Sequence, residues 1–122
     1  MSKNLILNIK KICKEKYGNY VIQYLLQLGN QNFNRKIVLA LIDELVVLSK
    51  LKFSSNVIEK CLNFSDENTV NIILQYMIKP NIICEMMYDN YGNYVLQKAL
   101  AVAKGDLRFS LFKVLYKIQS NN

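Results

Sequence analysis

A seven-residue stretch that occurs three times constrains this chain more than any other feature. Tyr17–Gln23 reads YGNYVIQ, Phe53–Glu59 reads FSSNVIE, and Tyr91–Gln97 reads YGNYVLQ. The copies begin 36 and then 38 residues apart. Repeats of this length are typical of solenoids, in which stacked helical units bury a continuous core. We therefore expect an all-α solenoid of about three repeats with three helices each.

Two positions of the repeated stretch are apolar in every copy, and we expect both to lie in the core. They are Val21, Val57 and Val95, followed by Ile22, Ile58 and Leu96. Helical spacing of apolar residues, interrupted by Gly-, Asn- and Pro-containing turns, predicts nine helices. These helices are expected over 5–16, 18–28, 33–42, 45–51, 57–64, 70–78, 82–87, 92–103 and 107–118. The repeats then span about 1–43, 44–79 and 80–119 of one domain.

Composition narrows the class of protein. The chain has 122 residues, 52% of them hydrophobic, and its apolar runs are too short to cross a bilayer. No secretory cleavage site follows the N-terminus, so we expect a cytoplasmic protein without membrane contact. The net charge of +7 suggests a polyanionic partner, although lysine-rich helices can also simply be soluble.

Metal and redox chemistry find little support in the sequence. Cys13, Cys61 and Cys84 are widely spaced, and the chain has no histidine. We expect three buried, reduced thiols and neither zinc nor another cofactor. Because the sequence also lacks a phosphate-binding glycine loop and a nucleophile with a partner base, we do not expect an enzyme.

Polar residues repeat in the same register as the apolar ones. On a helix, residues four apart share a face, so the first and last members of each set point together, with the second beside them. The three sets are Asn19, Tyr20 and Gln23; Ser55, Asn56 and Glu59; and Asn93, Tyr94 and Gln97. Stacked repeats would align these sets as a ladder along one surface.

The chemistry of the ladder matches nucleobases. A carboxamide donates and accepts, as the edge of uracil requires, whereas the carboxylate of Glu59 accepts from the two adjacent donors of guanine. A tyrosine ring offers a face for base stacking. Helices of neighbouring repeats pack about 8–10 Å apart, and a base with a side chain slotted against it spans about 7 Å, twice the stacking rise. One base per repeat is therefore geometrically natural.

These sets resemble the Pumilio (PUF) family of RNA-binding repeat proteins, and the resemblance covers nearly the whole chain. The series Asn-Tyr-x-x-Gln, Ser-Asn-x-x-Glu, Asn-Tyr-x-x-Gln is similar to the last three of the family's eight repeats. The resemblance implies a partial Pumilio homology domain over 1–122 with an armadillo-like right-handed superhelix. It also implies base reading by the first and last member of each set and stacking by the second.

In the family the RNA runs antiparallel to the protein. The resemblance therefore implies that the set at 93–97 reads U, the set at 55–59 reads G and the set at 19–23 reads U. The implied site is 5′-UGU in mRNA 3′ untranslated regions, with repression of the target mRNA. The resemblance also implies a regulatory protein partner at the connection Ile78–Ile82 and the outer face.

Other features leave alternatives open. Lys60 and Lys98 contact phosphate or are merely solvated, and Tyr17, Phe53 and Tyr91 are expected to be packing residues. Apolar residues at both ends, Leu5–Leu7 and Leu111, Phe112 and Leu115, indicate a segment of a longer array or end-to-end self-association. The rival functions are a protein-binding α-solenoid of the armadillo or HEAT kind, and sequence-independent RNA binding as in nucleolar relatives of the family.

Overall fold

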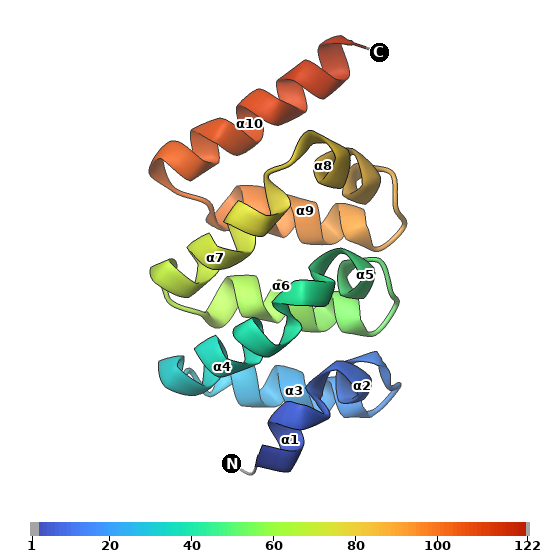
Figure 1. The fold of residues 1–122 in the computed structure, drawn as a ribbon, viewed down its shortest axis with the longest axis vertical. Helices are drawn as coiled ribbons and strands as arrows, with labels where there is room; N and C mark the ends of the chain where they lie inside the picture. Colours follow the sequence, from blue (N-terminus) through green and yellow to red (C-terminus); the bar gives the residue numbers. More distant parts are fainter. Residues whose placement is uncertain (1–2, 122) are drawn as a thin grey trace.

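A computed structural model describes residues 3–121 and shows three tiers of helices stacked along the long axis (Figure 1). All regular secondary structure within these residues is helical. The two ends of the chain lie at opposite ends of the stack. The expectation of an all-α solenoid of about three repeats is therefore confirmed.

Each tier contains three α-helices, and a short helix precedes the first tier. The helices are α1 (Lys3–Leu7), α2 (Ile9–Lys14), α3 (Gly18–Gln27), α4 (Gln31–Leu41), the 3-10 helix η1 (Ile42–Glu44), α5 (Leu45–Ser49), α6 (Ser54–Phe64), α7 (Glu67–Met77), α8 (Pro80–Met87), α9 (Gly92–Val102) and α10 (Gly105–Ser120). The middle helix of each tier packs on the middle helix of the next, α3 on α6 and α6 on α9. This stacking sets the equivalent residues of the three repeats side by side.

Side-chain caps and turn residues mark several helix ends. The side chain of Asn30 accepts a hydrogen bond from the Phe33 N–H (3.0 Å), and that of Asp66 accepts one from the Thr69 N–H (2.9 Å). Pro80 opens α8 at its first turn, where its missing N–H costs nothing. Gly29 follows α3 with φ of +78°, a conformation that favours glycine.

The first predicted helix, 5–16, is wrong in one respect, because the chain breaks at Asn8. Helix α1 ends at Leu7 and lies against α4, whereas α2 starts at Ile9 and packs against α3. Asparagine favours helix caps over helix interiors. The Asn8 carbonyl accepts the first hydrogen bond of α2, from the Ile12 N–H.

Of the two apolar positions in the repeated stretch, the second is buried in all three repeats and the first is buried in the second and third repeats only. Ile22, Ile58 and Leu96 are all buried, and Val57 and Val95 are fully buried. Val21, however, is 53% exposed, so its assignment to the core is wrong. The tier before α6 or α9 covers the valine there, but α3 begins the stack.

Other packing expectations are also corrected at the ends of the stack. Tyr17 is 73% exposed and is not a packing residue, whereas Leu111, expected at an open end, is fully buried. Cys13 and Cys61 are buried as expected, and Cys84 is only half-buried. Desolvation raises the pKa of the Cys13 thiol to about 12 and raises that of Cys61 as well, which keeps both protonated.

Two side-chain amides hold the first and second tiers together. Gln31 Nε2 donates to the Phe64 carbonyl (3.0 Å), and Gln31 Oε1 accepts from the Asp66 N–H (2.8 Å). The buried Asn34 donates through Nδ2 to the carbonyls of Leu26 (3.1 Å) and Phe64 (3.2 Å). The amides therefore clamp backbone groups across the junction.

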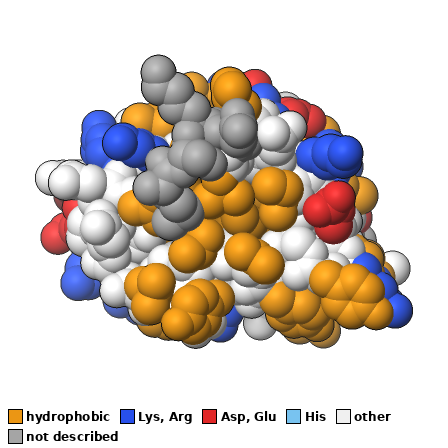
Figure 2. All heavy atoms as spheres, turned by 90° about the horizontal axis from the view of Figure 1, so that it is seen from below, with side chains coloured by type: hydrophobic (Ala, Val, Ile, Leu, Met, Phe, Trp, Pro, Cys, Tyr) orange, Lys and Arg blue, Asp and Glu red, His pale blue; other side chains and the backbone are white. Residues whose placement is uncertain are grey.

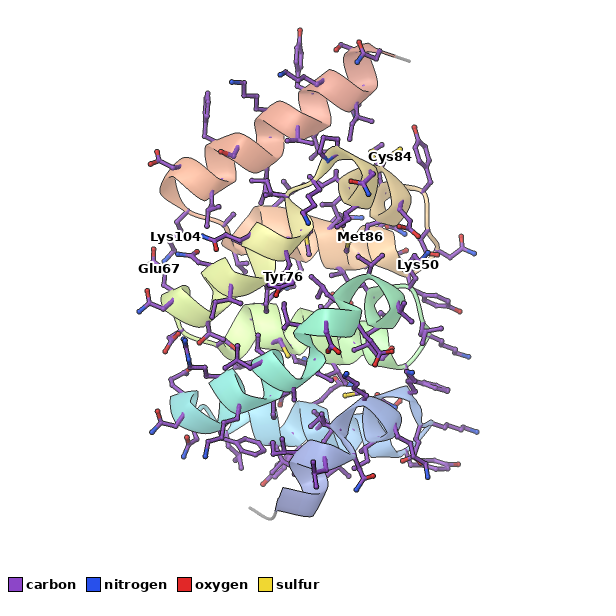
Figure 3. All side chains as sticks on the ribbon, viewed as in Figure 1. Lys50, Glu67, Tyr76, Cys84, Met86 and Lys104 are labelled. Carbon is purple, nitrogen blue, oxygen red and sulfur yellow. The ribbon has the colours of Figure 1, made fainter. Side chains whose placement is uncertain are left out.

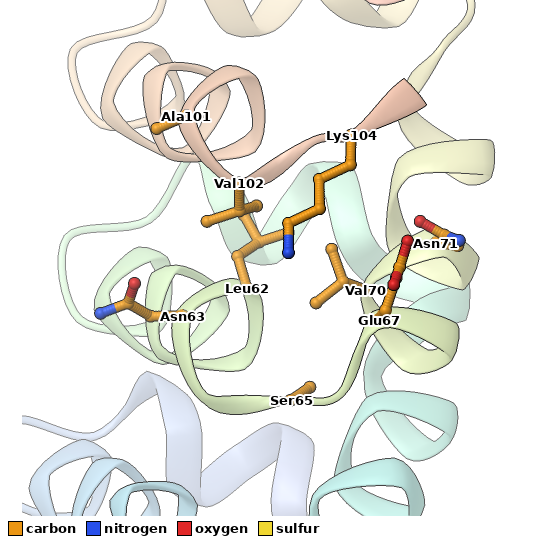
Figure 4. Close-up of a pocket in the computed structure, with 9 residues that line it drawn as sticks. All are labelled: Leu62, Asn63, Ser65, Glu67, Val70, Asn71, Ala101, Val102 and Lys104. Carbon is orange, nitrogen blue, oxygen red and sulfur yellow. The ribbon is translucent and has the colours of Figure 1, made fainter. Parts of the chain in front are cut away.

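The junction between the second and third tiers lacks this clamp. Glu67 and Val70 stand at the positions equivalent to Gln31 and Asn34, and within residues 3–121 neither side chain forms a hydrogen bond across this junction. A hollow of about 260 Å³ lies there instead, lined by both residues and by Lys104 (Figure 4). Figure 3 shows Glu67 and Lys104 at the same edge of the stack.

Candidate nucleic-acid interface

The nine predicted site residues lie on the first two turns of α3, α6 and α9. Because these three helices pack in order, the sets form a ladder, one set per tier. The last member of each set, Gln23, Glu59 or Gln97, is at least partly exposed. The structure therefore brings the last members of the three sets together on one surface, whereas the first members Asn19 and Ser55 are buried beneath it.

In the first set, Asn19 holds Gln23. Asn19 is fully buried, and its Nδ2 donates to the carbonyls of Glu15 and Lys16, both at 2.8 Å. These two bonds fix the amide so that Asn19 Oδ1 accepts from Gln23 Nε2 at 2.8 Å. Gln23 is left with its Oε1 and its second N–H to offer to a ligand.

The third set repeats this arrangement. Asn93 Nδ2 donates to the carbonyls of Asp89 (2.7 Å) and Asn90 (3.1 Å), and Asn93 Oδ1 accepts from Gln97 Nε2 (3.1 Å). Asn93 is half-buried rather than buried, and Gln97 is exposed. The same donor–acceptor pattern thus recurs two tiers away.

The middle set differs in a way that suits a carboxylate. Ser55 Oγ donates to the Lys52 carbonyl (3.3 Å), and within the described residues it forms no hydrogen bond with Glu59. Within residues 3–121, Glu59 has neither a hydrogen bond nor an ion pair. Both of its carboxylate oxygens are consequently available as acceptors.

The second members of the sets stand beside the ladder in solvent. Tyr20 is 63% exposed and Tyr94 is 58% exposed, so each presents a free ring face. Asn56 is also exposed, and its Nδ2 lies 3.4 Å from the Lys52 carbonyl. Aromatic faces exposed in this way are suitable platforms for planar ligands.

A polar hollow of about 170 Å³ lies on this surface between the tiers. It is lined by Gln23, Asn56, Glu59, Lys60, Asn63 and Lys98, which come from all three repeats. The two lysines make its rim attractive to anions. Asn63 was not among the predicted site residues, although its place four residues after Glu59 on the same helix face was a usable signal.

The described part of the chain offers no set of side chains that could bind a metal ion. Residues 3–121 contain no cluster of three or more His, Cys, Asp or Glu side chains that could hold an ion. In the same span, no helix has the length and apolarity needed to cross a bilayer. The sets of polar residues that form the ladder recur in every tier of this surface.

Comparison with known proteins agrees with this geometry. The pattern of the Pumilio-family RNA binding repeat matches residues 8–42, 46–78 and 83–115. Pumilio homolog 12 of Arabidopsis thaliana is 37% identical over 100 residues, covering 82% of this chain and 17% of that protein. Putative pumilio homolog 10 of the same plant is 36% identical over 114 residues, covering 91% of this chain and 21% of that protein. The chain thus spans about a fifth of the length of these curated relatives.

Solved structures give the same result. A crystal structure of PUF-8 in complex with PBE-RNA matches with a TM-score of 0.84 and 29% identity, over 93% of this chain and 34% of that chain. The Puf3 RNA binding domain bound to a Cox17 RNA 3′ UTR recognition sequence matches with a TM-score of 0.84 and 27% identity, over 97% of this chain and 39% of that chain. The chain therefore belongs to the Pumilio (PUF) family of RNA-binding repeat proteins.

Proposed function

We propose that this chain binds single-stranded RNA and reads one base per repeat, with 5′-UGU as its preferred triplet. The proposal rests on the order of side-chain groups along the ladder, which is carboxamide, carboxylate, carboxamide at Gln23, Glu59 and Gln97. RNA-bound PUF structures share the fold, which supports RNA as the ligand class. The chain is proposed to act as a binding protein and not as an enzyme.

Uracil suits the two glutamines because their amides are oriented. Asn19 engages one N–H of Gln23 (2.8 Å), so the Gln23 oxygen and the remaining N–H face the ligand. An oxygen beside an N–H complements the uracil N3–H and an adjacent carbonyl. Asn93 does the same for Gln97. In this proposal the two asparagines complete the uracil sites from behind the glutamines.

Guanine suits the middle repeat because the Glu59 carboxylate has no partner of its own. Two free acceptor oxygens match the adjacent N1–H and N2–H donors of guanine, in charge-assisted hydrogen bonds. The same carboxylate faces the acceptor-rich edge of uracil unfavourably. Ser55 is small enough to leave the carboxylate unobstructed.

Stacking and charge supply the part of the affinity that does not depend on sequence. We propose that Tyr20, Asn56 and Tyr94 contact base faces and that Lys60 and Lys98 contact phosphates. Stacking contributes about 1–3 kcal/mol per base. Three bases held in this way give a binding free energy on the order of −5 to −8 kcal/mol, a micromolar or weaker affinity.

The proposed biological role is binding to mRNA 3′ untranslated regions, with repression of the target in the cytoplasm. A regulatory protein is proposed to dock on the connection Ile78–Ile82 and the outer face. In that connection Lys79, Pro80 and Asn81 are exposed, as a docking site requires. The second repeat spacing exceeds the first by two residues, 38 against 36, and we place the two extra residues in this connection. Deleting two residues there should abolish partner binding and leave RNA binding in place.

A comparison of short RNAs tests the reading order. We expect fluorescence anisotropy titrations at fixed salt to rank UGU above UCU and ACA. Changing Ser55→Asn together with Glu59→Gln should convert the preference from UGU to UUU, because the middle site then equals the outer two. Equal affinity for all three RNAs would indicate sequence-independent binding, and a double variant that still prefers UGU would overturn the assignment of Glu59.

A further inference from the structure

The contacts of Gln31 show how the backbone of this fold binds a carboxamide. Gln31 Nε2 donates to the Phe64 carbonyl (3.0 Å), and Gln31 Oε1 accepts from the Asp66 N–H (2.8 Å). Phe64 ends α6 and Asp66 is the N-cap of α7, so the acceptor and the donor lie two residues apart. This pair of backbone groups holds both polar atoms of a side-chain amide from the tier before.

The second junction repeats the backbone pair but not the glutamine. By the register of the repeats, Val102 takes the place of Phe64. Lys104, the N-cap of α10, takes the place of Asp66. Within residues 3–121 the Val102 carbonyl accepts no hydrogen bond and the Lys104 N–H donates none. Glu67, which replaces the glutamine, cannot satisfy both groups, because an ionised carboxylate only accepts.

The hollow at this junction has the size and the lining that a single side chain needs. Its volume of about 260 Å³ lies below that of pockets for drug-sized ligands, about 300–1,000 Å³. Leu62 and Val70, which are 1% and 6% exposed, line it together with the backbone pair. Figure 4 shows Lys104 extending over the hollow and Glu67 at its side. The apolar stem of a glutamine would therefore meet apolar walls, and its amide would meet polar groups.

The hollow lies between two tiers that the chain itself supplies. Leu62 and Asn63 of α6, with Glu67, line one side, and the end of α9 with Lys104 lines the other. Figure 2 shows apolar side chains gathered at the N-terminal end of the stack, which the first tier separates from this junction. The hollow thus does not depend on what packs on either end of the stack.

We propose that this hollow binds the carboxamide side chain of a glutamine from a partner polypeptide. The carboxamide oxygen accepts from the Lys104 N–H, and one N–H donates to the Val102 carbonyl, as in the clamp one tier earlier. The second N–H is available to Glu67, whose carboxylate has neither a hydrogen bond nor an ion pair within residues 3–121. A glutamate would bind less well, because its carboxylate would face two further acceptors, the Val102 carbonyl and Glu67.

A polypeptide fits the hollow better than RNA does. The edge of uracil also presents a donor beside an acceptor. Reading one base per repeat, however, leaves no spare base between the second and third tiers, and the equivalent backbone pair holds a glutamine. Asn63 lines both this hollow and the polar hollow of the ladder, so a bound partner would lie next to bound RNA. The comparison with RNA rests on the proposed function, whereas the carboxamide site does not.

An NMR titration of the isotope-labelled full chain with N-acetyl-glutamine methylamide tests the site without RNA. We expect the backbone amide resonance of Lys104 to shift and to saturate. For so small a ligand the dissociation constant should be on the order of 1–10 mM. N-acetyl-glutamate methylamide keeps the size and lacks the side-chain donor, so it should bind about tenfold more weakly.

Two variants remove the site in different ways. Glu67→Gln gives the junction an amide of its own, and Ala101→Trp places a large side chain in the hollow from an exposed position. Each should abolish the shift of the Lys104 resonance. Gln75→Trp is the matched control, because Gln75 is exposed on α7 and does not line the hollow; it should bind as the wild type does.

A further variant transfers the site to the first junction. Gln31→Ala frees the Phe64 carbonyl and the Asp66 N–H from the clamp. The same glutamine ligand should then shift the Asp66 resonance, which it should leave in place in the wild type. Circular dichroism should show every variant folded.

Three results would overturn the proposal. The first is a Lys104 resonance that does not move at ligand concentrations about tenfold above the expected dissociation constant. The second is equal binding of the glutamine and glutamate ligands, or binding that persists in Glu67→Gln or Ala101→Trp. The third is a stronger response of Lys104 to uridine that Ala101→Trp abolishes, because the hollow would then hold a nucleobase instead of a side chain.

Discussion

Replacing Gln31 with leucine would show how much the amide clamp contributes to holding the first two tiers together. The substitution removes two hydrogen bonds across the junction, Nε2 to the Phe64 carbonyl (3.0 Å) and Oε1 from the Asp66 N–H (2.8 Å). Each hydrogen bond contributes about 0.5–1.5 kcal/mol net. Gln31 and Asp66 are exposed, so water replaces part of the loss, and Asn34 still donates to Phe64. We expect the free energy of unfolding to fall by about 1–2 kcal/mol.

Urea denaturation followed by circular dichroism measures this change, with Gln75→Leu as the matched control. Gln75 is an exposed residue of α7 without a clamping role, so its replacement should shift stability by less than about 0.5 kcal/mol. Hydrogen exchange should also quicken at the Asp66 amide in Gln31→Leu. Equal unfolding free energies for the two variants would refute the view that the clamp couples the tiers.

Three further measurements test other parts of the structure. Tyr94→Ala should weaken binding to every RNA by about 1–3 kcal/mol, and an unchanged titration would show that the ring is not a stacking platform. The hydrogen bond from the Thr69 N–H lowers the pKa of the Asp66 carboxyl. The ionised Asp66 therefore stabilises the folded state above the unfolded pKa, and this stabilisation is lost as the pH falls through the folded pKa. As the pH falls from about 6 to about 3, through the unfolded pKa of about 3.9 and toward the lower folded value, the wild type should therefore lose more stability than Asp66→Asn, and parallel curves would contradict this. A thiol reagent should label Cys84 alone in the native protein and all three cysteines after unfolding; rapid native labelling of Cys13 or Cys61 would contradict their burial.

The three-tier fold could be predicted from the sequence because the repeat fixes which positions are equivalent. Burial of Ile22, Ile58 and Leu96 followed from that register. Burial of Val21 did not follow, because it depends on whether a tier precedes it, which the register does not state. The break at Asn8 was missed because the apolar spacing of 5–16 suits one helix, while packing of α1 on α4 requires a bend.

The candidate site could be predicted as a set of residues but not as a network. The spacing of four placed Asn19 with Gln23 on one face. It could not show that Asn19 is fully buried and gives both donors of its Nδ2 to the carbonyls of Glu15 and Lys16. Those carbonyls lie in the turn between α2 and α3, four and three residues before Asn19, and the spacing of polar and apolar residues does not give the conformation of that turn. The clamp at Gln31 was missed because it is a tertiary contact, with partners that lie 33 and 35 residues away in the sequence.

The network explains why the first and last members of a set change together. An asparagine at the first position turns its oxygen toward the last position, because its nitrogen is held by two backbone carbonyls. A glutamine at the last position can donate to that oxygen, but a carboxylate would face it as a second acceptor and be repelled. Serine at position 55 removes the opposing oxygen and turns its own hydroxyl to the Lys52 carbonyl. The exchange of Asn and Gln for Ser and Glu is thus one coordinated change, and it converts an oriented amide into an unpaired pair of acceptors.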